Sequence, residues 1–251
     1  MTDVTPAAKN HFSIPTDNER ETHYLVELYH MSHDLRGPLN SILGFSELLL
    51  EGIEGPLNKN QEADISAIYQ SAQNLLRLIN ELVDLSRIGN DRLFLMSEAV
   101  DLRQIIYNIV NFDYGTNKPE NLEIIAEENS ESMPYFMGDP DRVEQIITNL
   151  VRYGFKPKKT SKVIVSTNWD DREIRVQVQY NNLFLSEEAV SELFQLIIHT
   201  DEVGRTDLGA GGLGIPLAFQ LAQLQGGRLW LEQDPEIGDS LHVSFPFIEA
   251  E

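Results

Sequence analysis

The first third of the chain carries a heptad pattern of apolar and small residues, with steps that alternate between three and four. Such a pattern is typical of helices that pack side by side in coiled coils and bundles. It breaks at EGIEGPLN, residues 51–58, where two glycines and a proline favour a turn. The pattern therefore predicts a helical hairpin. The heptad positions are Leu25, Leu28, Ser32, Leu35, Leu39, Ile42, Ser46, Leu49 and Ile53 before the turn, and Ile65, Ile68, Ala72, Leu75, Ile79, Leu82 and Ser86 after it.

A single hairpin does not cover all of its apolar surface. Leu43, Leu50, Leu76 and Val83 widen the stripe beyond the heptad positions. Two hairpins packed as a four-helix bundle would bury this surface. The sequence therefore predicts a homodimer.

After Ile88 the pattern changes to short strands alternating with amphipathic helices. A helix is expected from about Asp101, and the alternating segment at 161–180 predicts two strands that turn at Asp170 and Asp171. Helices on one face of a mixed sheet make an α+β fold, here a two-layer sandwich that follows the hairpin. Strands are also expected at 121–128 and in 228–247, and helices at 138–156, 186–197 and 214–227.

The formal net charge of −21 excludes some classes of partner. Such a field repels nucleic acid and anionic membranes, so neither is expected to bind. The absence of cysteine excludes disulfides and thiolate-bound metal, and no metal site is assigned. No apolar run is long enough to span a membrane, and the first eighteen residues lack the apolar core of a signal peptide. We expect a cytoplasmic protein with a disordered tail at residues 1–19.

The segment HMSHDLRGPLNSI, residues 30–42, holds the strongest candidate for chemistry. His33 follows the heptad position Ser32, which places it at the shoulder of the predicted bundle. Asp34 is adjacent, and a carboxylate can orient an imidazole for nucleophilic attack. Pro38 removes a helical hydrogen bond and should bend the helix nearby. The competing interpretation is an exposed surface histidine without a function.

The motif SHDLRGPLNSILGFSELL, together with NLLRLINELVDLSRI at 74–88, resembles the phospho-acceptor region of two-component sensor histidine kinases. The resemblance implies that residues 20–90 form the dimerisation and histidine-phosphotransfer domain, with His33 as phospho-acceptor and Asp34 as general base. It further implies that residues 97–248 form the ATP-binding domain. Gly37 stands where the family usually has a Thr or Asn that positions water for dephosphorylating the partner.

Two nucleotide-binding motifs of that family are substituted in this chain. The family's N-L-x-x-N-A-x-K reads Asn149 to Lys156 here, with Tyr153 in place of the magnesium-binding asparagine. A phenol is a poor ligand for this hard cation. The family's adenine-binding D-x-G-x-G, expected after the strand IRVQVQ at 174–179, is replaced by residues 180–184. Of these, Tyr180, Asn182 and Phe184 occupy the positions of the Asp and the two glycines.

The second glycine motif is better preserved. Gly209, Gly211, Gly212 and Gly214 precede a helix expected from about Ile215, and backbone amides at a helix start suit phosphate. The D-x-G-x-G match at 207–211 belongs to this segment rather than to the adenine site. Weak nucleotide binding, if any, is therefore assigned to these glycines with Asn149 and Lys156.

Three interpretations follow. The first is a phosphotransfer protein whose His33 exchanges phosphate with a receiver-domain aspartate of a response regulator, with ATP-dependent autophosphorylation weak or absent and no assigned cofactor. The second is a working kinase that uses ATP and Mg²⁺ through substitute ligands: Asn149, Glu144 or Asn182 for the metal and the Tyr180 hydroxyl for adenine. The third is a dimeric scaffold without chemistry.

Overall fold

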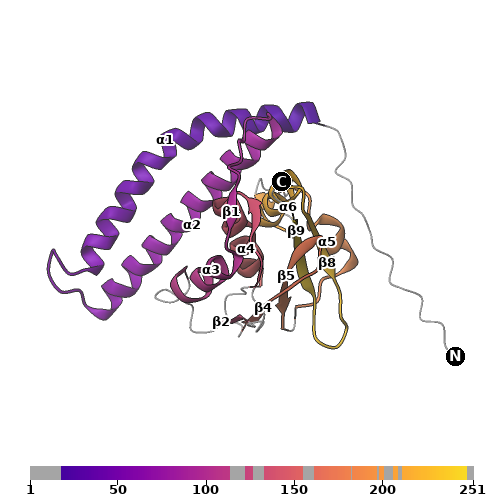
Figure 1. Cartoon of the computed structure of the whole chain (residues 1–251). Coiled ribbons are helices and arrows are strands. Elements are labelled where there is room, and N and C mark those ends of the chain that lie inside the picture. The colour runs from indigo at the N-terminus through magenta and orange to yellow at the C-terminus, as the bar shows by residue number, and fades with distance from the viewer. Residues whose placement is uncertain are drawn as a thin grey trace.

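The computed structural model describes residues 18–113, 122–126, 133–154, 161–181, 183–196, 198–200, 206–208 and 211–247. Side chains are described from residue 34 onward, except at 112–113, 122, 161, 198–200 and 206–208. The predicted helical hairpin is confirmed. Helices α1 (Asn18–Leu50) and α2 (Lys59–Gly89) run antiparallel, and α1 continues through Pro38 and is visibly curved (Figure 1).

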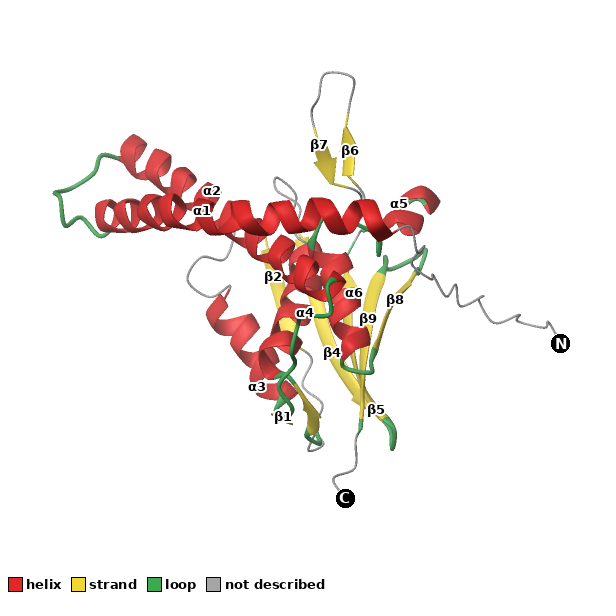
Figure 2. Ribbon diagram, turned by 90° about the horizontal axis from the view of Figure 1, so that it is seen from above, coloured by secondary structure: helices red, strands yellow, loops and turns green. Residues whose placement is uncertain are grey.

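The hairpin is followed by a two-layer α/β domain, which confirms the predicted fold class. Its main sheet has the order β2-β4-β5-β9-β8, in which β2 and β4 are parallel and all other neighbours antiparallel. Helices α3, α4 and α6 lie on one face of this sheet (Figure 2). The strands are β2 (Leu122–Ala126), β4 (Ser161–Trp169), β5 (Glu173–Tyr180), β8 (Arg228–Glu232) and β9 (Ser240–Pro246). The helices are α3 (Leu102–Asn108), α4 (Pro140–Tyr153), α5 (Glu187–Glu192) and α6 (Gly214–Leu224).

Local sequence explains where several helices begin. The Asn58 side chain accepts hydrogen bonds from the first turn of α2 and Gln61 reaches back to it, a reciprocal capping box. Asp101 and Ser186 cap α3 and α5, and Asp139 caps α4 ahead of Pro140. Residues of β5 alternate between buried and partly exposed, because one face of the sheet is covered by helices and the other is open.

Some elements differ from the predictions. The helix expected over 186–197 ends at Glu192. Leu193 and Phe194 do not continue the helix, and their side chains are buried in the core. Strand β7 (Thr206–Leu208) pairs with β6 (Ile198–Thr200), and neither strand was predicted. Short strands β1 (Glu98–Val100) and β3 (Phe136–Gly138) also pair, and α3 continues as a π-helical turn at Ile109–Asp113. Short elements of this kind depend on tertiary contacts, which periodicity does not report.

One apolar core holds the α/β domain together and extends onto α2. It comprises inward residues of β4, β5 and β9 and the facing sides of α4 and α6, and Leu85 of α2 belongs to it. A smaller cluster of Leu39, Ala72 and Ile79 lies between the two hairpin helices. Among the described helices, none combines the length and apolar character needed to cross a bilayer.

Candidate functional site

The candidate phospho-acceptor segment lies within α1. His33 belongs to this helix, but its side chain lies outside those described. Asp34, Gly37 and Pro38 are exposed. One turn beyond His33, the Arg36 guanidinium donates to Asn80 Oδ1 of α2 at 2.8 Å, which fixes the register of the two helices at this height. The segment therefore lies on a part of α1 that is hydrogen-bonded to α2.

The substituted adenine position is occupied by a fully buried ring. Tyr180 ends β5 on the face that packs against the helices, and only 1 % of its surface is exposed. Its hydroxyl donates a 2.7 Å hydrogen bond to the backbone carbonyl of Leu150 in α4. Burial raises the pKa of this phenol well above its usual value, so it stays protonated as a donor. The hydroxyl that the second interpretation assigns to adenine is therefore directed into the core.

A glycine makes room for this ring. A Cβ atom at Gly154 would lie 2.4 Å from Cδ1 and 2.8 Å from Cε1 of Tyr180, and 2.8 Å from Cγ2 of Val163. Real Cβ atoms do not approach carbon so closely, so only glycine fits here without displacement. The family pattern has alanine at this position. The large Tyr180 and the small Gly154 are therefore a complementary pair.

The substituted magnesium position packs against the same ring. Tyr153, the last residue of α4, meets Tyr180 edge-to-face with ring centroids 5.8 Å apart. Burial, and then the negative charge of Asp239, raise the pKa of Tyr153 to about 12. A neutral phenol in an aromatic pair cannot act as the anionic oxygen donor that a divalent cation favours.

Asn149 is committed to a contact within the protein. Its side chain is buried, and Nδ2 donates to the backbone carbonyl of Gly214 at 3.1 Å, joining α4 to the first turn of α6. Gly214 is close enough that an added Cβ would lie 3.3 Å from the Asn149 amide carbon. Gly211 packs so tightly on the Leu193 carbonyl that no side chain fits. These two glycines have a packing role whether or not phosphate binds.

A buried carboxylate organises the loop that replaces the adenine glycines. Asp239 is 1 % exposed, and its Oδ2 accepts from the backbone N–H of Leu185 at 2.7 Å. Its own backbone N–H donates to the Leu183 carbonyl at 2.8 Å. Phe184, between them, is 54 % exposed. Residues 183–185 are therefore held by hydrogen bonds to Asp239, and Phe184 presents an apolar side chain at the surface.

The structure brings some of the predicted residues together and leaves others undescribed. Asn149, Tyr153, Tyr180, Gly211 and Gly214 gather around α4 and the start of α6. Lys156, Asn182 and Gly209 lie outside the described residues. Within the described part of the chain, no group of three or more His, Asp or Glu side chains could hold a metal ion.

Sequence reasoning missed three contributors to this region: Gly154, Asp239 and the carbonyl of Leu150. Gly154 stands where the family has alanine, and it directly follows the substituted Tyr153. This change could have indicated that a large side chain packs against Gly154. Asp239 left no signal, because an acid beside a glycine in a loop before a strand is usually solvent-exposed.

Comparison with known proteins identifies two domain families in the chain. Residues 27–91 match the His Kinase A (phospho-acceptor) domain. Residues 138–249 match the histidine kinase-, DNA gyrase B- and HSP90-like ATPase domain. The two matches follow the hairpin and the α/β domain in the same order.

Curated relatives are sensor proteins much longer than this chain. It is 29% identical over 228 residues to the sensor protein GacS of Pseudomonas syringae pv. syringae, covering 89% of this chain and 25% of the relative. It is 29% identical over 218 residues to the circadian input-output histidine kinase CikA of Synechococcus elongatus, covering 86% and 29%. The signal transduction histidine-protein kinase BarA of Escherichia coli is also 29% identical, with 85% and 23% covered. The chain thus spans about a quarter of the length of these relatives.

Solved structures share the fold. Full-length ShkA in complex with AMPPNP superposes with a TM-score of 0.65 at 23% identity, covering 89% of this chain and 46% of ShkA. The histidine kinase ThkA in complex with the response regulator TrrA gives 0.58 at 18% identity, covering 92% and 66%. Acinetobacter baumannii AdeS gives 0.57 at 14% identity, covering 86% and 98%.

Proposed function

Because the chain belongs to the two-component sensor histidine kinase family, we propose that His33 is a phospho-acceptor that exchanges its phosphoryl group with the aspartate of a receiver domain, while autophosphorylation from ATP is weak or absent. In this exchange the imidazole of His33 attacks the phosphorus of an aspartyl phosphate, and the carboxylate leaves. Asp34 orients the imidazole and takes up its proton.

The proposal that autophosphorylation is weak or absent rests on one observation. The Tyr180 ring is buried, and its hydroxyl donates a hydrogen bond to the Leu150 carbonyl. In the family this position supplies an acidic acceptor to adenine. Loss of a hydrogen bond to a charged group costs about 1.5–3 kcal/mol. Loss of the magnesium ligand at Tyr153 would have a similar cost. Together the two losses would weaken the affinity for the nucleotide roughly a thousandfold. The contacts of Tyr153 and Tyr180 therefore support the proposal that ATP with Mg²⁺ binds weakly or not at all.

A receiver domain is the proposed partner, and a second copy of the chain is the proposed dimer subunit. Outward-facing apolar residues of the hairpin support the dimer: Leu35, Ile42, Phe45, Ile68 and Leu75 are between 41 % and 69 % exposed. Such a row on paired helices is buried efficiently when two hairpins form a four-helix bundle. We propose residues 20–90 as the dimerisation and phosphotransfer domain and 97–248 as the nucleotide-type domain.

Two incubations test the proposal. Purified protein with labelled ATP and Mg²⁺ should acquire little label, whereas incubation with a labelled phospho-receiver should label it at His33. His33→Ala should abolish the second labelling. Robust labelling from ATP that disappears in His33→Ala would refute the loss of kinase activity. Failure of every tested receiver to label His33 would refute the phosphotransfer role.

The working kinase is the second candidate function. The match to the ATPase family over residues 138–249 favours it, because that family binds ATP and Mg²⁺. Glycines before α6 also leave backbone amides at a helix start, an arrangement suited to phosphate. Calorimetry with ATP, with and without Mg²⁺, separates the two candidates: tight, magnesium-dependent binding selects the kinase.

A further inference from the structure

Strand β8 is the last strand on one side of the main sheet. Its described neighbour is β9, and Figure 2 shows β8 at the outer side of the sheet. Its other edge therefore carries backbone N–H and C=O groups with which no described strand pairs. Natural sheets usually protect such an edge with proline, a bulge or repelling charges, because it can pair with another chain. The sequence of β8, RLWLE at 228–232, contains no proline, and its register with β9 is continuous.

The hydrogen-bond pattern determines which groups of β8 lie on this edge. The Tyr180 N–H donates to the Asp239 carbonyl at 3.1 Å, where β5 meets the start of β9. Because alternate residues of an antiparallel ladder bond to opposite sides, odd-numbered residues of β9 bond to β5 and even-numbered residues bond to β8. The register pairs these with the even-numbered residues of β8. The N–H and C=O groups of Leu229 and Leu231 therefore point to the free edge.

A second copy of β8, in antiparallel orientation, matches this edge. When Trp230 lies opposite the second copy's Trp230, Leu229 lies opposite the second copy's Leu231, and the outward groups of these two residues can bond to each other. Arg228 then lies opposite the second copy's Glu232, and the two-fold axis repeats this charge pair. A parallel arrangement would instead place arginine against arginine and glutamate against glutamate. Backbone pattern and charge thus favour the same antiparallel register.

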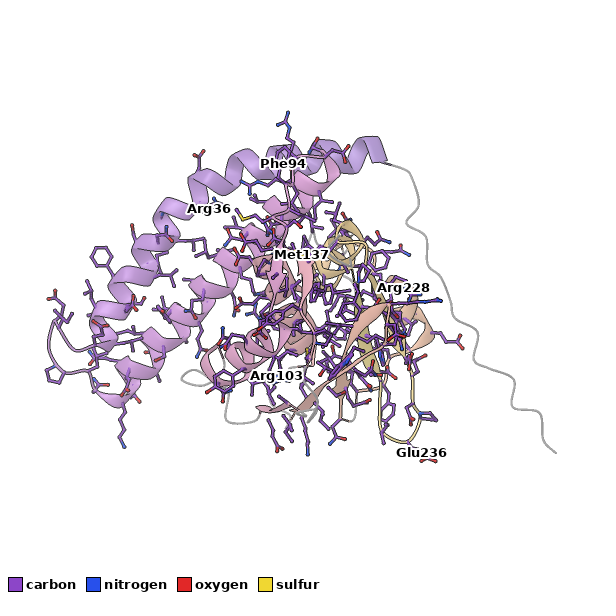
Figure 3. The ribbon with its side chains drawn as sticks, viewed as in Figure 1. Arg36, Phe94, Arg103, Met137, Arg228 and Glu236 are labelled. Carbon is purple, nitrogen blue, oxygen red and sulfur yellow. The ribbon has the colours of Figure 1, made fainter. Side chains whose placement is uncertain are left out.

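The side chains that would meet across this edge are accessible and ordered. Arg228 and Glu232 lie on the open face of the sheet, with 62 % and 60 % of their side-chain surfaces exposed. Between them, the Trp230 Nε1 donates to Glu232 Oε1 at 2.8 Å, and the Trp230 ring stacks on His242 with centroids 5.2 Å apart. Figure 3 shows the Arg228 side chain extending outwards from the α/β domain. Tryptophan and arginine are the residues most often found to dominate binding at protein interfaces.

We propose that β8 pairs with β8 of a second copy of this chain, antiparallel and centred on Trp230, so that two five-stranded sheets join into one. This contact lies at the edge of the α/β domain and is separate from the dimer of hairpins proposed above. A protein with both contacts assembles hairpin dimers into larger oligomers, because the two interfaces are different. The pairing depends on neither nucleotide binding nor phosphate at His33.

Oxidative cross-linking of the full chain tests the pairing, because the sequence contains no cysteine. In Trp230→Cys, the two new residues would face each other with Cα atoms about 4.5 Å apart, within the range of about 4.4–6.8 Å that a disulfide spans. Mild oxidation of the native protein should therefore give a disulfide-linked dimer on a denaturing gel. The matched control is Asn168→Cys, which exposes a thiol on the same face of the sheet but in β4, away from the β8 edge, and should stay monomeric on that gel.

Charge variants distinguish the proposed register from random collision. In the Trp230→Cys protein, Arg228→Glu would place carboxylates opposite each other, and Glu232→Arg would do the same with guanidinium groups. Each change should slow cross-linking about tenfold, because two attractive pairs become repulsive. An equal mixture of the two charge variants should recover the Trp230→Cys rate and yield mixed dimers by mass, since each copy then meets opposite charges. A variant that had lost its fold could not recover in the mixture.

Three results would overturn the proposal. The first is a Trp230→Cys protein that cross-links no faster than Asn168→Cys, which would leave the edge free or available only to a different protein. The second is a pair of charge variants that each cross-link as fast as Trp230→Cys alone. The third is a mixture that cross-links no faster than either charge variant by itself.

Discussion

Replacing Gly154 by alanine tests the packing pair that supports the proposed weakness of nucleotide binding. The backbone at Gly154 is helical, with φ −70° and ψ −12°, so alanine suits it and would by itself be mildly stabilising. The added Cβ, however, would lie 2.4 Å from Tyr180 Cδ1 and 2.8 Å from Val163 Cγ2. Neither neighbour is at the free end of a flexible chain. Tyr180 is also held at its hydroxyl by the Leu150 carbonyl.

Overpacking of a rigid core typically costs about 1–3 kcal/mol, so Gly154→Ala should lower the free energy of unfolding by that amount. Urea unfolding followed by circular dichroism measures it. In a Tyr180→Ala background only the contact with Val163 Cγ2 remains, so the same substitution should lower the free energy of unfolding by less than it does in the wild type. The difference between the two backgrounds isolates the contact between the ring and the Cβ atom.

Gly89→Ala is the matched control, because Gly89 is also helical and nothing lies within 4 Å of its added Cβ. It should leave stability unchanged or raise it by up to about 1 kcal/mol. A Gly154→Ala protein as stable as Gly89→Ala would refute the reasoning, since Tyr180 would then not occupy the space beside Gly154.

Three further outcomes are expected. Tyr180→Phe removes the donor to the buried Leu150 carbonyl and should cost about 1–3 kcal/mol in urea unfolding; an unchanged midpoint would show that this bond is not formed. Burial raises the pKa of Tyr153 from 10.0 to about 12, so the stability linked to its neutral form is complete below pH 10 and is lost as the pH rises towards 12. Tyr153→Phe should lessen that alkaline loss, measured as thermal midpoint against pH, and an identical profile would contradict the assignment. Asn149→Asp replaces the amide donor to the Gly214 carbonyl by an acceptor and should destabilise the protein by about 1–3 kcal/mol, whereas a neutral result would exclude that contact.

Much of the architecture was predictable because it depends on regular spacing. Heptad positions such as Leu39 and Ile79 predicted the hairpin, and both are buried between its helices. Alternation in 173–180 predicted a strand with one covered face, and β5 has that pattern. Capping residues such as Asp101 fixed a helix start within one residue. The substitutions at Tyr153 and Tyr180 were equally visible in the printed sequence.

What those two tyrosines do was decided only by the tertiary structure. A side chain at the end of a strand can turn towards solvent, ligand or core, and its sequence neighbours do not determine which. Tyr180 turns inward because Gly154, directly after α4, leaves space for its ring and the Leu150 carbonyl accepts a hydrogen bond from its hydroxyl. The pairing of Asp84 with Arg142, between residues 58 positions apart, is of the same kind. Local periodicity therefore determined the elements, and contacts between distant segments determined where the side chains at the two substituted positions lie and how the α/β domain contacts the hairpin.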